Sequence, residues 1–465
     1  MRTITRLAKG LAKGLAALVA VAGLALFGWL YAAPPELIRV GSGYAAKIVC
    51  SNVFIAGRDA QQVLEVDVQA PGHPLLKLMR VSVDSEEKLV RAGLLGVLGR
   101  STAVAREGLG CANVPDGDTG RARAVQLADA PASGQSSPTL WPQGDRVEAA
   151  AAEVAGVLAD DNLAGQGMRA IVVVRDGRIV GERYGEGFSQ ATPLLGWSMS
   201  KTVNAAIVGT LVRDGRMSLE DAHLFPAWEG DERATITVAD LMAMSSGLAF
   251  NEDYGTVADV TRMLYLEPDM AGFAGSLPLV GPVGGSFSYS SGTSLLLARL
   301  WQDALGDPQQ ALQWPRSALF SPLGMDSAVM EADASGTFVG SSYIYATARD
   351  WARFGQFLLQ DGVWNGKQIL PPGFVSWMRE PAPASNGIYG KGQLWLEAPD
   401  GNGRRMGVPA DTFWFKGHDG QTVAVIPSRR MVVVRMGLTP RAVGYTPELL
   451  ISALVATLNP PGGPE

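Results

Sequence analysis

The residues best suited to chemistry are Ser198 and Lys201, three positions apart in the sequence Trp-Ser-Met-Ser-Lys-Thr. Residues three apart lie on one face of a helix, and the helical pattern over 203–212, which stops near Gly215, predicts a helix that begins at this motif. A serine needs a group that takes its proton, and a buried lysine with a lowered pKa can do so or can hold a neighbouring base deprotonated. The apolar residues on both sides indicate that Lys201 is buried. The pattern therefore predicts a serine hydrolase that acts through an acyl-enzyme on Ser198.

A tyrosine motif lies further along the chain, at 287–292, where Phe-Ser-Tyr-Ser-Ser-Gly contains Tyr289. Together with the Ser-x-x-Lys motif it resembles the serine β-lactamase and penicillin-binding-protein superfamily, in the branch with class C β-lactamases, esterases, D-aminopeptidases and 6-aminohexanoate-dimer hydrolases. That family has Tyr-x-Asn here, so the resemblance implies that Tyr289 shares proton transfer with Lys201. A phenol has a reference pKa of about 10, and a charged Lys201 nearby would lower it. The alternative is a tyrosine packed at the edge of a strand.

A third motif, His-Asp-Gly at 418–420, precedes a predicted strand, as the Lys-Thr-Gly or His-x-Gly motif of the family does. The resemblance implies that the N–H groups of Ser198 and Gln421 form the oxyanion hole, the fixed donors for the charge that develops on a carbonyl oxygen. Gly420 lets a substrate approach the backbone closely. His418 would contact the substrate, or it is a loop histidine whose hydrogen bonds are satisfied within the protein.

Two departures from the family pattern bear on the substrate, because Ser291 replaces the expected Asn and His418 replaces the expected Lys. In β-lactamases these positions help to bind the drug. The departures therefore place true β-lactamase activity in doubt and leave a small amide or ester as the expected substrate. The loop 251–255 resembles the loop that carries a substrate-facing tyrosine in 6-aminohexanoate-dimer hydrolases, which implies that role for Tyr254.

Other interpretations of these residues stay open. Glu252 and Asp253 either attract a substrate ammonium group or are solvated loop acids. The enzyme could instead be a β-lactamase, D-aminopeptidase or carboxypeptidase that acts on cell-wall material, or the fold could serve as a catalytically silent binding or sensor domain. A Ser-His-Asp hydrolase has little support, because residues 196–200 lack the Gly-x-Ser-x-Gly turn. We expect no cofactor, and the three histidines lack zinc-site spacing.

The elements that must position these motifs are two hairpins with helical segments between them. Asp-Gly at 176–177 joins two runs of strand residues, and Ser-Arg-Arg at 428–430 joins two more before a helix that begins at Thr446-Pro447-Glu448. This order predicts an α+β fold with an antiparallel sheet flanked by helices. The family resemblance covers about 145–460 and adds an all-helical subdomain.

The part of the chain before this domain differs in composition. Alternating runs at 63–68 and 77–83 predict half-buried strands in a small, mostly β accessory region over 36–127. The stretch 128–144, rich in Pro, Ser, Gly and Ala, is expected to be a linker. Asp145, with Glu148 three residues later, predicts a capping box at the start of the hydrolase domain over 145–460.

The first 35 residues are typical of a membrane anchor or a signal. Basic residues up to Lys13, without an acid, precede an uncharged apolar run from Gly14 to Ala33, about the 20 residues that span a bilayer. The basic flank should stay in the cytoplasm, so the body would lie on the periplasmic side of the inner membrane, anchored or released by cleavage near Pro34.

Export also affects the two cysteines, Cys50 and Cys111, because thiols in an oxidising compartment tend to pair. A disulfide between them is expected, and two separately buried thiols are the alternative. The net charge of -6 over 465 residues, without a basic block after Lys13, gives no nucleic-acid footprint. The expected partners are thus a small-molecule substrate and a membrane.

Overall fold

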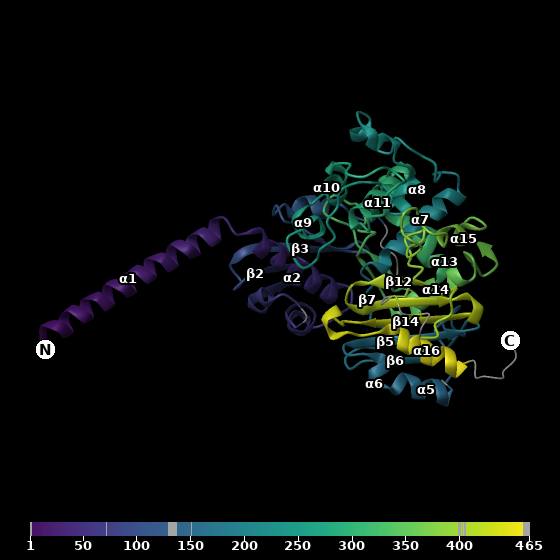
Figure 1. Cartoon of the computed structure of the whole chain (residues 1–465), viewed down its shortest axis with the longest axis horizontal. Coiled ribbons are helices and arrows are strands. Elements are labelled where there is room, and N and C mark those ends of the chain that lie inside the picture. The colour runs from purple at the N-terminus through teal and green to yellow at the C-terminus, as the bar shows by residue number, and fades with distance from the viewer. Residues whose placement is uncertain are drawn as a thin grey trace.

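The centre of the molecule is a five-stranded antiparallel sheet in the order β12-β13-β14-β5-β6 (Figure 1). The computed structural model describes residues 2–70, 72–128, 137–149, 151–398, 401, 403 and 406–458, with the backbone alone for 2–10. The strands are β5 (Met168–Arg175), β6 (Arg178–Tyr184), β12 (Phe413–Gly417), β13 (Gln421–Ile426) and β14 (Met431–Gly437). Both predicted hairpins are confirmed, and β14 pairs with β5, so the two ends of the expected hydrolase domain over 145–460, or hydrolase part, meet in one sheet.

Alternate side chains of these strands enter two different cores, as the period of two in a strand requires. Val172 and Val434 point to the main core, whereas Val173 and Val433 point to a smaller core on the other face. The main core is covered by α14 (Ala348–Leu359), and the smaller one by α5 (Ala152–Ala159), α6 (Asp161–Ala164) and α16 (Pro447–Leu458). The expected α+β arrangement is confirmed.

A helical part lies beside the sheet, above it in Figure 1. Its helices are α8 (Val238–Met242), α9 (Asp259–Leu266), α10 (Met270–Ser276), α11 (Ser291–Leu305), α12 (Pro308–Trp314) and α13 (Ser321–Leu323), and α15 (Phe374–Met378) follows later. The predicted helix at the Ser-x-x-Lys motif is α7 (Met199–Arg213). It contacts α11 on one side and β12 and β13 on the other, so residues at its start lie between the sheet and the helical part.

Short strands complete the hydrolase part. A three-stranded sheet joins β7 (Leu194–Leu195), β9 (Ile344–Ala346) and β8 (Val329–Met330), and a two-stranded one joins β10 (Val363–Trp364) and β11 (Lys367–Gln368). Because β7 leads directly into α7, its pairing with β9 fixes the chain just before the serine.

The accessory region contains a long helix that the sequence did not reveal. Helix α2 (Glu36–Phe54) packs on a four-stranded antiparallel sheet of β1 (Met79–Asp84), β2 (Leu89–Leu94), β3 (Leu98–Arg106) and β4 (Gly110–Asn113), and α4 (Thr119–Ala124) follows. Glycines at 41 and 43 weaken its helical pattern. They are tolerated because packing decides, and a Cβ at Gly43 would lie 2.9 Å from the Tyr265 backbone of α9.

The predicted disulfide between Cys50 of α2 and Cys111 of β4 is confirmed, with Cα atoms 6.1 Å apart. The predicted strand at 77–83 is β1, but the one at 63–68 is wrong. There the chain forms α3 (Ala60–Val63) and a π-helical turn (Leu64–Gln69), because the Asp59 side chain caps α3 and the buried residues follow a helical rather than an alternating pattern.

The predicted capping box at Asp145 is also wrong, since the next helix, α5, begins at Ala152 without a side-chain cap. The Asp145 carboxylate instead accepts from Ser137 N–H and pairs with Arg353, at 3.0 and 3.1 Å. These contacts hold the chain in the series of turns and bends that it makes over 139–146. Of the expected linker, 129–136 lie outside the described residues, and Trp141 is buried.

The N-terminal helix α1 (Arg2–Ala32) extends away from the body (Figure 1). Its segment Leu11–Ala32 has a mean hydropathy of 2.1, and by length and composition it is the one described helix that could cross a membrane. A signal sequence meets the same criteria.

Candidate active site

Ser198 stands at the start of α7, behind a tight turn that follows β7. Its predecessor Trp197 has a φ of 49°, a left-handed conformation that is rare for a bulky residue and is found at strained functional turns. Gly196 is needed for space, because a Cβ there would lie 2.2 Å from the Trp351 ring. Among the described residues the Ser198 N–H has no acceptor, so it is available at the helix start.

Lys201 lies one turn further along α7 and is almost completely buried. Its Nζ donates to the hydroxyl of Ser198 at 3.2 Å, to that of Ser291 at 2.9 Å and to the carbonyl oxygen of Ser341 at 3.1 Å. Burial lowers its pKa to about 8, against an opposing contribution from Glu252. A lysine with this pKa exchanges protons readily near neutral pH, as a general base must.

Tyr289 lies just before α11 and faces the same two residues. Its ring centroid is 4.8 Å from the Lys201 Nζ, and its hydroxyl lies close enough to Ser198 for that side chain to influence its pKa. Burial raises its pKa well above the usual value, with smaller contributions from Tyr389 and Glu252. The expectation that Lys201 lowers this pKa is therefore wrong, because the cost of burying a phenolate dominates. Tyr289 keeps its proton at neutral pH and is suited to donate it.

Ser291, the residue at the family's Asn position, links the lysine to a carboxylate. Its hydroxyl accepts from Lys201 and donates to Glu252 at 2.5 Å, while its N–H donates to the same carboxylate at 2.7 Å. The carboxylate is stabilised at the start of α11 because it accepts this N–H, one of the free donors of a helix N-terminus. The chain from Lys201 through Ser291 to Glu252 is a contact that the sequence did not predict.

The contacts of the two loop acids, Glu252 and Asp253, match neither of the two roles that the sequence suggested for them. Both oxygens of Glu252 are engaged by Ser291, and the Asp253 carboxylate accepts from the Gly255 N–H at 2.8 Å. Neither is simply solvated. Nothing in the spacing from 252 to 291 could indicate that the two residues meet, since the contact depends on how α11 is placed.

Tyr254 connects the predicted catalytic residues to a ring cluster that consists of Trp197, Tyr254 and His418. Burial raises the pKa of the Tyr254 hydroxyl well above the usual value, and the nearby Ser291 and Ser342 side chains oppose that rise. Its ring stacks on His418 with centroids 5.0 Å apart, and the Trp197 ring meets both edge-on. The structure thus brings the predicted substrate-binding residues Tyr254 and His418 together beside the turn that precedes Ser198.

The segment 417–421 closes the site from the sheet. A Cβ at Gly417 would lie 2.3 Å from the Gly196 carbonyl oxygen, so the end of β12 touches the turn before Ser198. His418 is nearly half exposed, and Gly420 has a φ of 81°. The side chain of Gln421 is buried and exchanges two hydrogen bonds with the backbone of Gly437, which ties β13 to β14.

A sequence model of the Beta-lactamase family matches residues 158–441. A 6-aminohexanoate-dimer hydrolase of Paenarthrobacter ureafaciens is 26% identical over 220 residues, which are 44% of this chain and 55% of that protein. The chain thus spans about half the length of this curated relative. The segment 158–441 that the family model matches contains Ser198, Lys201 and Tyr289, and it excludes the accessory region.

Two solved structures extend the comparison. A Bacillus anthracis protein, provisionally assigned as a 6-aminohexanoate-dimer hydrolase, is 25% identical with a TM-score of 0.54, over 64% of this chain and 79% of that one. A penicillin-binding-protein homologue from Caulobacter crescentus is 16% identical with a TM-score of 0.51, over 67% and 99%. The second likeness is one of fold alone.

Proposed function

The chain belongs to the Beta-lactamase family, and we propose that it is a serine hydrolase that cleaves a small amide or ester through an acyl-enzyme on Ser198. The observation that carries this proposal is the 3.2 Å hydrogen bond between the Ser198 hydroxyl and Lys201, whose pKa is lowered to about 8. A neutral fraction of the lysine is then present at neutral pH and can take the serine proton.

In acylation, the neutral Lys201 takes the hydroxyl proton as the Ser198 Oγ bonds to the carbonyl carbon. The carbonyl electron pair moves onto oxygen, where the N–H of Ser198, and by family resemblance that of Gln421, stabilise the charge. Tyr289 donates its proton to the leaving amine or alcohol as the bond between the carbonyl carbon and this group breaks. Lys201 then gives the proton that it took from Ser198 to Tyr289. A water molecule then attacks the carbonyl carbon of the acyl-enzyme and gives a proton to the pair of Lys201 and Tyr289. The same pair returns a proton to the Ser198 Oγ, which leaves as the hydroxyl.

The residues at two positions bear on the substrate. Ser291 uses its hydroxyl to link Lys201 with Glu252, and His418 stacks on Tyr254 instead of presenting a lysine ammonium to a substrate carboxylate. These contacts favour an amide or ester without the carboxylate of a β-lactam. A β-lactamase or a peptidase of cell-wall material is the second enzymatic candidate.

A substrate screen with the detergent-solubilised full chain tests this proposal. Substrates would be p-nitrophenyl acetate, D-alanyl p-nitroanilide, 6-aminohexanoate dimer and nitrocefin, each with wild type and Ser198→Ala. We expect Ser198-dependent turnover of the ester or an amide and little turnover of nitrocefin. Preference for nitrocefin would favour the β-lactamase, and no turnover together with no fluorophosphonate labelling would indicate a silent domain.

We also infer that α1 anchors the hydrolase in the inner membrane with its body on the periplasmic side. The basic residues before Gly14 support this orientation, and the apolar segment Leu11–Ala32 has the length to span. Cleavage as a signal is the alternative.

A further inference from the structure

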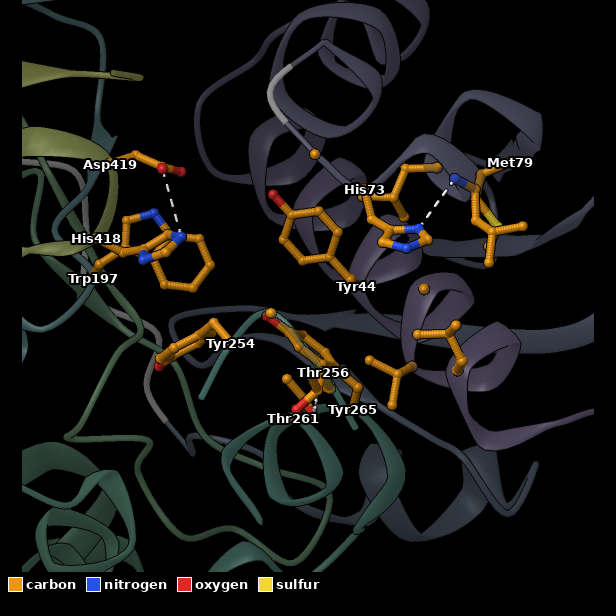
Figure 2. Close-up of a pocket in the computed structure, with 17 residues that line it drawn as sticks. Tyr44, His73, Met79, Trp197, Tyr254, Thr256, Thr261, Tyr265, His418 and Asp419 are labelled. Carbon is orange, nitrogen blue, oxygen red and sulfur yellow. Dashed lines mark hydrogen bonds and ion pairs between the residues drawn. The ribbon is translucent and has the colours of Figure 1, made fainter. Parts of the chain in front are cut away.

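A cavity of about 170 Å³ lies between the accessory region and the hydrolase part (Figure 2). Trp197, Tyr254 and His418 form one side of it, and residues of α2 and of the chain that leads into β1 form the other. Tyr44 stands between the two sides in Figure 2. The cavity therefore begins at the ring cluster beside the turn that precedes Ser198, and it extends away from the five-stranded sheet.

The lining is mostly apolar. Val40, Leu76 and Met79 provide the far wall, and Tyr44 and Tyr265 meet edge to face, with centroids 5.7 Å apart, along the side. Among the described residues no lysine or arginine lines the cavity, and its one carboxylate, Asp419, lies 3.5 Å from the His418 Nε2 at the near end. An uncharged, apolar group is the ligand that such walls favour.

Tyr254 joins this cavity to the reaction centre. Its ring lines the cavity, while its hydroxyl lies close enough to Ser291, the partner of Lys201, for that side chain to oppose the rise of its pKa. Tyr289, the proton donor for the leaving group, packs instead against Tyr389 and Trp395, which are not part of the cavity. The residues that line the cavity are therefore separate from those that surround the proposed proton donor for the leaving group.

The far wall of the cavity is held in place by the accessory region. It comes from 37–79, outside the segment that the family matches. The Cys50–Cys111 disulfide ties α2 to β4 within the accessory region, and a buried ion pair of 2.5 Å joins Lys47 of α2 to Glu331 of the hydrolase part. The accessory region is thus fixed where it closes one end of the cavity.

We propose that this cavity binds the apolar chain of the substrate's acyl group. The inference rests on the proposed function and narrows it to esters or amides of medium-chain acids. An engineered apolar cavity of about 150 Å³ binds benzene, so this cavity takes a chain of about six carbon atoms.

The test compares p-nitrophenyl esters of increasing acyl length on the full chain in one detergent. Burial of a methylene is worth about fourfold in binding, so kcat/KM should rise by on the order of 10² from acetate to hexanoate and level off beyond about eight carbons. A flat or falling series would overturn the proposal. Absence of any Ser198-dependent ester hydrolysis would instead remove the proposed function.

Variants then locate the effect. Gly41→Leu fills the cavity from α2, because a Cβ at this position already lies 2.8 Å from the flexible end of Met79. We expect the ratio of kcat/KM for hexanoate over acetate to fall at least tenfold. Gly156→Leu, at an exposed position of α5 with nothing within 4 Å, is the matched control and should keep the wild-type ratio.

A second variant guards against misfolding of Gly41→Leu. Leu37 lines the cavity mouth and is 38% exposed, so Leu37→Glu places a charge there at little cost to the core. It should also reduce the hexanoate-to-acetate ratio. If both folded variants kept the wild-type ratio, the chain would bind elsewhere and the proposal would be wrong.

Discussion

Replacing Glu252 by Gln should move the acidic limb of the pH profile of kcat/KM to lower pH. Glu252 raises the pKa of Lys201, which burial has brought to about 8, so loss of the negative charge lowers that pKa further. Because the neutral lysine is the base, more of it is then present at a given acidic pH. Glutamine has nearly the same shape and keeps one of the two oxygens that accept from Ser291, while an NH2 donor replaces the other, so the change removes the charge and one of these two hydrogen bonds.

The size of the shift follows from the geometry. Two hydrogen bonds in line place the Lys201 Nζ within about 5 Å of the carboxylate. At an effective dielectric constant of about 20, unit charges at that distance interact by about 3 kcal/mol, or about two pH units. Glu252 is partly exposed, so solvent weakens this interaction, and we expect the pKa of Lys201 to fall by about one unit. At pH 7 the fraction of Lys201 that is neutral would rise from about one tenth to about one half.

The assay is kcat/KM for one activated ester from pH 5.5 to 10. We expect about fivefold higher activity at pH 7 and no change above pH 9. Asp253→Asn, which removes the adjacent charge of the same loop, is the matched control and should leave the limb in place. A limb that stays fixed in Glu252→Gln, or that moves to higher pH, would refute neutral Lys201 as the base.

Three further predictions concern the relay, the disulfide and the membrane. Tyr289→Phe keeps the packing against Trp395 but should slow acylation by on the order of 10² to 10⁴, with Lys201→Ala comparable and the double variant far from multiplicative. Stopped-flow acylation at the wild-type rate would make Tyr289 a packing residue. Cys50→Ser should lower the free energy of unfolding by up to about 4 kcal/mol for a separation of 61 residues, and an unchanged denaturation midpoint would show that the cross-link adds no stability. Full-length protein should fractionate with membranes, whereas a soluble periplasmic species that starts near Pro34 would indicate a cleaved signal.

The sequence predicted those parts of the site that depend on local rules. Ser198 and Lys201 meet because residues three apart share a helix face, and the two hairpins follow from turn residues between strand-like runs. Tyr289 came from a motif resemblance, and its place beside Lys201 agrees with that role.

Other parts could not be predicted, because they depend on tertiary contacts. Helix α2 contains two glycines that lower its helical propensity, and one of them, Gly43, is needed for close packing on α9. The run at 63–68 alternates in sequence, yet an N-cap and helical burial override that pattern. The contact of Glu252 with Ser291 joins a loop to a helix N-terminus, and no spacing rule encodes it.

The measurement that tests the central claim most directly is intact-mass and peptide analysis of the acyl-enzyme after rapid quenching with an activated ester. We expect one acyl adduct on Ser198, lost in Ser198→Ala. The matched variant is Ser200→Ala, whose hydroxyl accepts a core hydrogen bond from Ile344 N–H at 3.2 Å. It should keep the adduct and most turnover, at a cost of about 1–3 kcal/mol in stability. An adduct on another residue, or turnover that persists in Ser198→Ala and is lost in Ser200→Ala, would contradict Ser198 as the nucleophile.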